Sequence, residues 1–392
     1  MRLLIITFYY PPDLSAGSFR IKELVTAFQN HNIDLRIDVI TTQPNRYYEM
    51  RHDYKNIENF KNLKIHRVEV PKHKNTMFSQ IFTFAHFAFK VLKYTKEKKW
   101  DYIFCTSSRL MTAYLGALIS NRNKTPLFID IRDIFSDTIR SYYRNLFIKL
   151  LLPIIFYIEK YTLKTAIKVY LVSPAFLNYF KKNHYLFKYK VVTNGIDEEF
   201  LRYNFKNNKK KNSKKIILYA GNIGDGQGLE KVIPYIAENL NDNYIFWIVG
   251  SGGKVLFLKK KVNELNLKNV KFFSPMSRSD LMKIYKKVDI LFLHLNNYSS
   301  NKKVLPSKIF EYGAIGKPII AGVLGESFKF MKKEIPSSFL FKPYDYTGIL
   351  KKINANEIIS INSNQEFEKK FDRKKIMKEF VYDLLREFKN LK

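Results

Sequence analysis

The chain has 392 residues, enough for two domains with separate cores, and its 46% hydrophobic content with many Phe and Tyr excludes general disorder. The single cysteine, Cys105, excludes an internal disulfide framework and a cysteine-cluster metal site, and it favours a reducing, cytosolic compartment. The formal net charge of +33 predicts an anionic partner, although a composition rich in Lys, Asn and Ile accounts for part of that charge.

The anionic partners that such a charge suggests are membrane lipid, nucleic acid and phosphorylated substrate. The chain shows no internal repeat and no recognisable nucleic-acid-binding motif, so we expect no nucleic-acid partner. The apolar run at residues 3–6 is ended too soon for a signal peptide by Tyr9-Tyr10-Pro11-Pro12. This run therefore predicts the first strand.

The N-terminal residues predict a βαβ opening. A strand at residues 2–7 is followed by a helix from about Phe19 to Asn30 and by a strand at residues 35–41. The loop between the first strand and this helix is where such sheets bind ligands. Gly17 in this loop either lets the backbone approach a phosphate or serves a plain turn, and Arg20 follows it on the phosphate or acceptor side.

Two apolar helical segments follow, at residues 77–94 and 146–158. The uncharged part of the first is too short for a bilayer span, which needs about 20 apolar residues. Lys149 and Pro153 interrupt the second. Both segments fit either core helices of the first domain or helices inserted at a membrane interface, and the basic charge favours the membrane.

Runs typical of buried strands at residues 102–106, 127–130 and 169–172 alternate with helical segments, which predicts a parallel sheet. Arg132 and Asp133 directly follow one of these runs, at the carboxyl end of a strand where parallel sheets place their chemistry. A salt-bridged structural turn is the competing interpretation of this pair.

A second domain is predicted to begin near residue 193. A strand at residues 216–220 leads into a loop with Gly221, Asn222, Gly224 and Gln227, and the strand at residues 244–249 ends in Gly250-Ser251. Eleven of the fifteen glycines lie between residues 221 and 325. Backbone N–H groups in such loops can hold phosphate, so we expect the ligand to be bound mainly by this domain.

The stretch at residues 305–320 combines polar groups with a setting built for burial. Pro306 is suited to opening a helix, so Ser307 and Lys308 lie at its first turn, where the unpaired N–H groups attract phosphate. Glu311 shares a helix face with both of them, which indicates hydroxyl recognition beside an anion site. Gly316 ends the helix.

The common phosphate and metal motifs are absent from the sequence. It contains neither the P-loop pattern nor the dinucleotide-binding fingerprint, which disfavours ATPase and dehydrogenase activities. The histidines are scattered and no Asp-x-Asp pair is present, so we expect no metal site and no cofactor. Helix N-termini and backbone donors would then meet the charge of a phosphate leaving group.

Taken in order along the chain, these motifs resemble the family 4 retaining glycosyltransferases, and the resemblance covers nearly the whole chain. It extends to the bacterial O-antigen and capsule branch that includes N-acetylfucosamine transferases. The motifs are Phe8-Tyr9-Tyr10-Pro11-Pro12 with Gly17, Arg132-Asp133, Asn194-Gly195-Ile196-Asp197, Tyr219-Ala220-Gly221-Asn222-Ile223-Gly224, Val249-Gly250-Ser251-Gly252 and Pro306-Ser307-Lys308-Ile309-Phe310-Glu311-Tyr312.

The resemblance implies an α/β GT-B fold, with two doubly wound Rossmann-like domains facing a cleft. The expected domains are residues 1–192, on the acceptor side with membrane-associating helices, residues 193–366, which bind the nucleotide sugar, and a helix at residues 367–392 that returns to the first domain. By this analogy Glu311 holds the ribose, Ser307 and Lys308 lie near the diphosphate, and Gly17 and the Gly250 turn also approach the donor.

Three departures from the family pattern bear on the chemistry. Lys303 stands where many relatives have a glutamate that contacts the transferred sugar, and Asn222 and Gln227 replace the usual basic pair that grips the diphosphate. Arg132 occupies the position of a first-domain histidine. Because a guanidinium stays protonated, Arg132 cannot act as a general base, and Asp133 is the expected orienting or catalytic carboxylate.

These observations predict a retaining, metal-independent glycosyltransferase. It would move an N-acetylhexosamine or N-acetylated deoxyhexosamine from a UDP-linked donor to a lipid-linked saccharide acceptor. The expected location is the cytoplasmic face of the inner membrane, held peripherally on its anionic lipids, in O-antigen or capsule synthesis. The alternatives are a sugar-nucleotide epimerase of the same fold and a non-catalytic basic protein of the membrane surface.

Overall fold

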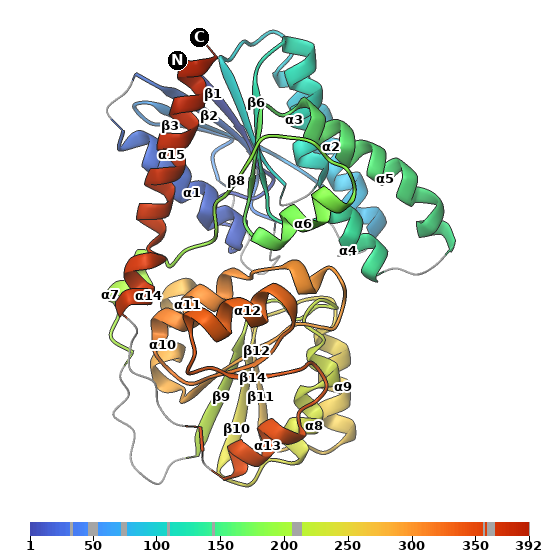
Figure 1. Cartoon of the computed structure of the whole chain (residues 1–392), viewed down its shortest axis with the longest axis vertical. Helices are drawn as coiled ribbons and strands as arrows, with labels where there is room; N and C mark the ends of the chain where they lie inside the picture. The colour runs from blue at the N-terminus through green and yellow to red at the C-terminus, as the bar shows by residue number, and fades with distance from the viewer. Residues whose placement is uncertain are drawn as a thin grey trace. The chain divides into compact units, whose positions relative to one another are not determined.

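The computed structural model describes residues 1–31, 34–45, 54–71, 77–107, 110–142, 146–205, 214–355, 357–358 and 365–391. The chain divides into two compact units (Figure 1). Unit 1 consists of Met1–Asn194 together with Arg373–Lys392, and unit 2 consists of Gly195–Asp372. Each unit has its own sheet and its own core.

Unit 1 alternates strands and helices along the chain, as the sequence predicts. Its strands are β1 (Arg2–Ile6), β2 (Arg36–Thr42), β3 (Ile57–Asn59), β4 (Leu63–Val68), β5 (Tyr102–Thr106), β6 (Leu127–Ile131), β7 (Lys168–Leu171) and β8 (Tyr189–Val191). Its helices are α1 (Ala16–Gln29), α2 (Met77–Tyr94), α3 (Leu110–Asn123), α4 (Phe135–Tyr142), α5 (Leu146–Thr165), α6 (Pro174–Lys182) and α15 (Arg373–Asn390).

The sheet of unit 1 has the strand order β3-β4-β2-β1-β5-β6-β7-β8, and the pairs are parallel except for β3 with β4. Strand β1 is buried from Leu3 to Ile6, because a parallel strand covered by helices on both faces needs a continuous apolar run. The chain moves outward from β1 in one direction through β2 and in the other through β5. The loops after β1 and β5 therefore diverge, which is where doubly wound sheets bind ligands.

Unit 2 is a second alternating α/β unit. Its strands are β9 (Lys215–Ala220), β10 (Tyr244–Val249), β11 (Val270–Phe273), β12 (Ile290–His294), β13 (Ile319–Gly322) and β14 (Phe339–Phe341). Its helices are α7 (Glu198–Arg202), η2 (Leu229–Lys231), α8 (Ile233–Glu238), α9 (Val255–Glu264), α10 (Arg278–Lys287), η3 (Asn301–Lys303), α11 (Ser307–Ile315), α12 (Gly325–Glu334), α13 (Thr347–Asn354) and α14 (Gln365–Lys370).

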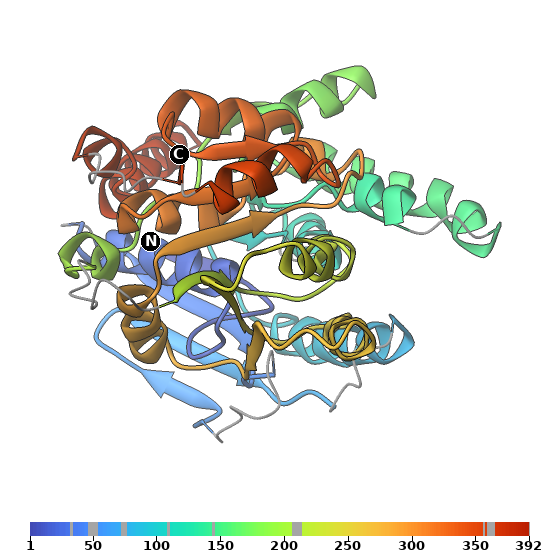
Figure 2. The same ribbon diagram turned by 90° about the horizontal axis from the view of Figure 1, so that it is seen from below.

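The sheet of unit 2 is parallel throughout, in the order β11-β10-β9-β12-β13-β14. Helices cover both of its faces (Figure 2). The direction of chain progression reverses between β9 and β12, so the loops that follow these two strands flank the topological switch point. Two doubly wound α/β units confirm the predicted fold class.

The C-terminal segment contains two helices, where the sequence analysis expected one. Helix α14 ends at Lys370, and Phe371 and Asp372 separate it from α15. At this break the backbone N–H of Ile196 donates to the carbonyl of Phe371 at 2.7 Å. Phe367 and Phe371 pack in the core of unit 2, whereas α15 begins at Arg373 and belongs to unit 1.

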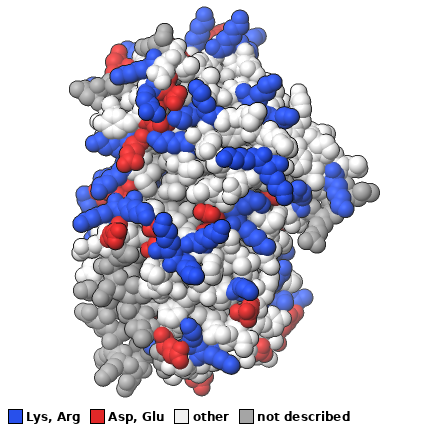
Figure 3. All heavy atoms as spheres, in the orientation of Figure 1, with Lys and Arg blue, Asp and Glu red and all other residues white. Residues whose placement is uncertain are grey.

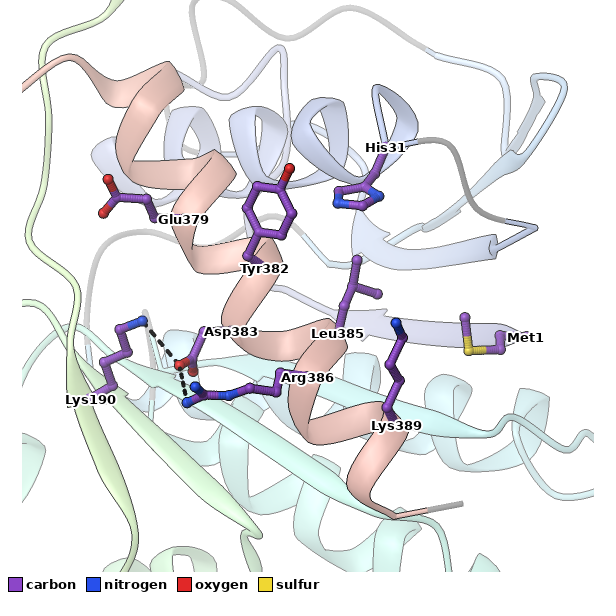
Figure 4. Close-up of a pocket in the computed structure, with 9 residues that line it drawn as sticks. All are labelled: Met1, His31, Lys190, Glu379, Tyr382, Asp383, Leu385, Arg386 and Lys389. Atoms are coloured by element: carbon purple, nitrogen blue, oxygen red, sulfur yellow. Dashed lines mark hydrogen bonds and ion pairs between the residues drawn. The ribbon is translucent and has the colours of Figure 1, made fainter.

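Helix α15 is fixed to unit 1 by apolar and ionic contacts. Its Phe388 ring stacks on Tyr102 with a centroid distance of 3.9 Å. On its other side Asp383 binds Lys168 at 2.7 Å and Lys190 at 3.0 Å. Figure 4 shows Asp383 between Lys190 and Arg386, beside a surface cavity of about 700 Å³ that runs along the helix. A C-terminal helix that packs on the first unit was expected, and α15 is that helix.

Among the residues that the structure describes, none of the helices combines the length and the apolar character needed to cross a membrane. Helix α2 packs partly in the core, since Phe84, Phe87 and Val91 are buried. Other positions on the same helix are exposed, which is the arrangement of an amphipathic helix.

Candidate functional site

The two glycine-rich loops of unit 2 pack against each other through their backbones. The N–H of Gly221 donates to the Val249 carbonyl, and the N–H of Ile223 donates to the Ser251 carbonyl, both at 2.9 Å. A Cβ on Gly250 would lie 1.9 Å from the Gly221 oxygen, and φ at Gly250 is +141°. Glycine is therefore required at residue 250 for loop-to-loop packing, a closer contact than the phosphate approach expected from the sequence.

The loop after β9 is also tied to the loop after β12, across the switch point. The Asn296 side chain donates to the Asp225 carbonyl at 2.9 Å, and the Asn301 side chain donates to the Gly226 carbonyl at 2.8 Å. These hydrogen bonds fix the path of the glycine-rich loop. Neither asparagine was predicted from the sequence, although both follow β12, which flanks the switch point.

His294, the last residue of β12, also contacts the loop after β9. Its Nδ1 lies 2.6 Å from the Gln227 carbonyl oxygen. Burial lowers the pKa of His294 to about 4, so the ring is neutral at pH 7 and Nδ1 must carry the proton that this bond requires. His294 is another positioning residue that was not predicted from the sequence.

Asn222, Gly224 and Gln227 lie together, as the sequence predicted. The Gln227 side-chain oxygen accepts from the Asn222 side chain at 2.9 Å and from the Gly224 N–H at 3.2 Å. The pair that replaces two basic residues is thus a neutral amide pair. A basic group lies close by, because Lys254 binds Asp225 at 3.1 Å, and this hydrogen bond raises the pKa of Lys254 despite partial burial.

The sequence predicts that Pro306 opens helix α11. In the structure the helix begins one residue later, at Ser307. Pro306 is instead the N-cap residue and provides no side-chain hydrogen bond to the first turn. The N–H groups of this turn are the part of the helix that favours an anion. The helix ends at Gly316 in the left-handed conformation, as predicted.

Lys308 and Glu311 form a partly buried ion pair of 2.8 Å on α11. Burial alone would lower the pKa of Lys308, but the neighbouring Glu311 raises it, so the ammonium stays charged. Glu311 is 8% exposed, and its charge also acts on Arg278, which pairs with Asp197. A carboxylate has about four acceptor positions, so Glu311 can bind sugar hydroxyls in addition to Lys308.

In unit 1 the predicted residues lie at the carboxyl edge of the sheet. Helix α1 begins at Ala16, so Gly17 belongs to the first helical turn, and the prediction that it lies in the preceding loop is wrong. The Ser15 hydroxyl caps this turn by accepting the Ser18 N–H at 3.1 Å. Local capping by Ser15 extends the helix further towards the strand than the apolar pattern from Phe19 suggests.

Arg20 is almost fully enclosed. Its guanidinium forms a bidentate pair with Asp130 through two contacts of 2.9 Å, and it donates to the carbonyls of Val192 and Thr193. Four of its five N–H donors are therefore used by the protein. This geometry gives Arg20 a structural role, in holding α1 to β6 and to the segment after β8.

Arg132 and Asp133 follow β6 at the same edge. The Arg132 backbone N–H donates to the Ser107 hydroxyl at 3.1 Å, which joins the ends of β5 and β6. Asp133 is exposed. Burial lowers the pKa of Arg132 to about 10, so it remains a cation at pH 7.

The predicted residues thus form two groups. Unit 2 brings together Asn222, Gly224, Gln227, Gly250, Ser251, Ser307, Lys308 and Glu311 on loops and a helix at its switch point, and unit 1 holds Gly17, Arg20, Arg132 and Asp133 at its sheet edge. Among the described residues there is no group of three His, Cys, Asp or Glu side chains arranged to hold a metal ion.

Comparison with known proteins finds a family match that covers most of unit 2. Residues 202–374 match the family described as glycosyl transferases group 1. The chain is similar to WcaI of Escherichia coli (strain K12), which is named as a colanic acid biosynthesis glycosyl transferase, with 41% identity over 105 residues. That match covers 26% of this chain and 25% of WcaI, so it spans about a quarter of the relative's length.

Solved structures share the fold of the whole chain. Sucrose-phosphate synthase from Thermosynechococcus elongatus aligns with a TM-score of 0.74 and 14% identity, over all of both chains. Anabaena Alr3699/HepE in complex with UDP-glucose aligns with a TM-score of 0.68 and 16% identity, over 98% of this chain and all of that one. These likenesses confirm the GT-B fold.

Proposed function

We propose an activity for this chain from one premise: residues 202–374 are a glycosyl transferases group 1 domain. The chain is a retaining glycosyltransferase that takes a sugar from a UDP-linked donor and transfers it to a lipid-linked saccharide. The transferred sugar is an N-acetylhexosamine or an N-acetylated deoxyhexosamine, and the product belongs to bacterial surface polysaccharide synthesis. The name of WcaI supports the pathway class, and the UDP-glucose in HepE supports the donor class.

The observation that carries this proposal is the start of α11 in unit 2. Uncapped N–H groups of the first turn, the Lys308 ammonium and the Glu311 carboxylate lie within one helical turn of each other, at the switch point of the sheet. The N–H groups and Lys308 suit a diphosphate, and Glu311 suits the ribose hydroxyls. A nucleoside diphosphate combines these two chemical groups.

Catalysis then follows from charge stabilisation. As the bond between the sugar and the diphosphate breaks, negative charge grows on the leaving phosphate while the sugar becomes oxocarbenium-like. Lys308 and the helix N-terminus stabilise this charge without a metal ion. Asp133, exposed at the unit 1 edge, is the proposed carboxylate that orients the acceptor hydroxyl, which attacks from the face that the diphosphate leaves.

Exposed apolar side chains on unit 1 are suited to contact the membrane that holds the acceptor's lipid. Helix α2 exposes Ile81, Phe82 and Phe89 by 58%, 65% and 65%, and α5 exposes Leu150, Ile154 and Tyr157 by 69%, 56% and 68%. Exposed lysines on the described parts of the same helices are Lys90, Lys93, Lys149, Lys160 and Lys164. Aromatic and aliphatic groups bordered by lysines are typical of helices that lie in an anionic membrane interface.

The basic character extends beyond these helices. Lysine and arginine side chains are spread over the face drawn in Figure 3, with fewer acidic ones between them. A surface of this kind is attracted to anionic lipid over distances of about a Debye length. We infer that the protein is held peripherally on the cytoplasmic face of the inner membrane.

A donor screen on the purified full-length chain tests the proposed function. Nucleotide sugars are screened for thermal stabilisation, since a ligand at a hundred times its dissociation constant stabilises by about 2.7 kcal/mol. The stabilising donor is then incubated with a lipid-linked saccharide. We expect nucleoside diphosphate to be released only with acceptor present, and NMR of the product to show the anomeric configuration of the donor. Release without acceptor would instead indicate a hydrolase, and conversion of the donor to its epimer without net release would indicate an epimerase.

A further inference from the structure

Three buried polar atoms at the carboxyl edge of the unit 1 sheet have no hydrogen-bond partner among the described residues. They are Ser18 Oγ, Thr106 Oγ1 and Arg132 Nη1. A buried donor or acceptor that stays unsatisfied destabilises the folded state. Several such groups in one place indicate a ligand that completes them.

The register of the sheet brings these groups to one face. Thr106 is paired with Asp130 across β5 and β6, so their side chains point to the same side. Asp130 binds Arg20 of α1, and Ser18 lies on the buried side of that helix, two residues earlier. Arg132 follows Asp130 by two positions. Because side chains alternate along a strand, its side chain lies on the same face as that of Asp130.

The charges at this edge do not cancel. The charged neighbours that act on Arg132 are Asp130, Arg20, Asp133 and Arg373. With Arg132 itself, this group contains three guanidinium cations and two carboxylates. Asp130 is already bound by both arms of Arg20, and Asp133 is exposed. Arg132 therefore keeps a buried cationic donor in a surrounding with an excess of positive charge.

We propose that Arg132, together with the hydroxyls of Ser18 and Thr106, is the anion-binding position of unit 1 and receives a phosphate group of a substrate. A tetrahedral phosphate presents oxygens in several directions, which suits one guanidinium N–H and two separate hydroxyl donors. The sequence placed Arg20 on the phosphate or acceptor side, and we assign phosphate binding to Arg132 instead. The identity of the phosphate, from the donor diphosphate or from the lipid-linked acceptor, rests on the proposed function.

Calorimetric titration of inorganic pyrophosphate into the full-length protein tests this position directly. Arg132→Met should weaken binding at least tenfold, and Arg132→Lys, which keeps the charge, should weaken it less. The matched control is Arg140→Met on α4, where Arg140 is 53% exposed and pairs with Asp137. Pyrophosphate affinity that is the same in the wild type, Arg132→Met and Arg140→Met would overturn the proposal.

Thr106→Val separates ligand binding from a structural role. Because the Thr106 hydroxyl has no partner in the described structure, its removal should leave the melting temperature unchanged or higher while it weakens pyrophosphate binding. A lower melting temperature with unchanged binding would contradict the assignment. This readout does not depend on whether the protein transfers sugar.

The source of the phosphate is resolved by two further measurements on Arg132→Met. A tenfold loss of UDP affinity assigns the position to the donor diphosphate. A tenfold rise in KM for a phosphate-bearing acceptor, without a rise for a phosphate-free analogue, assigns it to the acceptor. If pyrophosphate binding depends on Arg132 but no donor supports transfer by the wild type, the proposed function fails and the anion site stands.

Discussion

Gly250 and Gly253 lie three positions apart in one loop, but their surroundings are opposite. A Cβ at residue 250 would meet the Gly221 carbonyl oxygen at 1.9 Å, whereas a Cβ at residue 253 would meet nothing within 4 Å. We expect Gly250→Ala to lower the free energy of unfolding by about 2–4 kcal/mol and to weaken nucleotide binding, because two loops must separate. Gly253→Ala is the control and should stay within about 0.5 kcal/mol. Urea denaturation of both variants measures the difference, and equal stabilities would contradict it.

His294 gives the protein a predictable response to acid. Its pKa in the folded state, about 4, lies below the ordinary value of 6.5, so the unfolded state binds the proton more tightly between these values. The stabilisation is present above pH 6.5 and is lost as the pH falls towards 4. From pH 7 to pH 5 this amounts to about 2 kcal/mol.

His294→Asn checks this response, because an amide can still donate to the Gln227 carbonyl but does not titrate. We expect the loss of stability between pH 7 and pH 5 to be smaller in this variant than in the wild type by about 2 kcal/mol. Denaturation curves at the two pH values measure it. Parallel pH dependence in the two proteins would show that His294 does not supply the effect.

Single residues were predicted from the sequence where local chemistry decides their role. Lys308 and Glu311 form the pair that helical spacing indicated. Arg20 was expected on the phosphate or acceptor side, but the structure commits it to Asp130, 110 positions away. A pairing between residues so far apart in the sequence depends on the fold, and no local sequence pattern predicts it.

At the scale of helices, α2 and α5 carry the membrane proposal. Phe82→Glu combined with Phe89→Glu places two charges on the exposed side of α2, and we expect binding to vesicles with anionic phosphatidylglycerol to fall at least tenfold. High salt should also weaken the binding of the wild type. Vesicle co-sedimentation measures both effects.

The matched control is Leu256→Glu on α9 of unit 2, where Leu256 is 78% exposed. This variant adds a charge at a similarly exposed apolar position outside α2 and α5. It should bind vesicles as the wild type does. An equal loss in this control would mean that net charge, rather than the two helices, governs membrane binding.

Helix α15 shows what one buried carboxylate contributes to an element. Asp383→Ala leaves Lys168, which is 7% exposed, without its nearest anionic partner. Removing one member of a buried pair costs about 3–5 kcal/mol. Arg386→Ala, at a position 71% exposed, should cost about 0–1 kcal/mol. Chemical denaturation compares the two variants, and a similar small cost for both would contradict the anchoring role of Asp383.

Element positions followed from the apolar pattern more reliably than element ends. The strands before both glycine-rich loops lie where predicted, because buried parallel strands have continuous apolar runs. The start of α1 was placed too late, since Ser15 capping extends the helix beyond its apolar stripe. The break between α14 and α15 was missed, because a hydrogen bond from the distant Ile196 stabilises it.

At the scale of the whole molecule, two doubly wound units were predictable because strands and helices alternate throughout both halves. The glycine-rich loops after β9 and β10 also lie where the sequence predicts them, at the ends of these strands. The side chains that fix these loops, His294, Asn296 and Asn301, come from a strand and a loop about 70 positions later in the chain. Only the folded sheet brings them to the loop.

The central claim is that unit 2 binds a nucleoside diphosphate through the first turn of α11 and Glu311. Calorimetric titration of UDP into the wild type and Glu311→Gln tests it most directly, with uridine as the ligand that lacks the diphosphate. We expect UDP to bind the wild type, uridine to bind much more weakly, and Glu311→Gln to lower UDP affinity at least tenfold. Unchanged UDP affinity in Glu311→Gln, or no binding of any nucleoside diphosphate to the wild type, would contradict the claim.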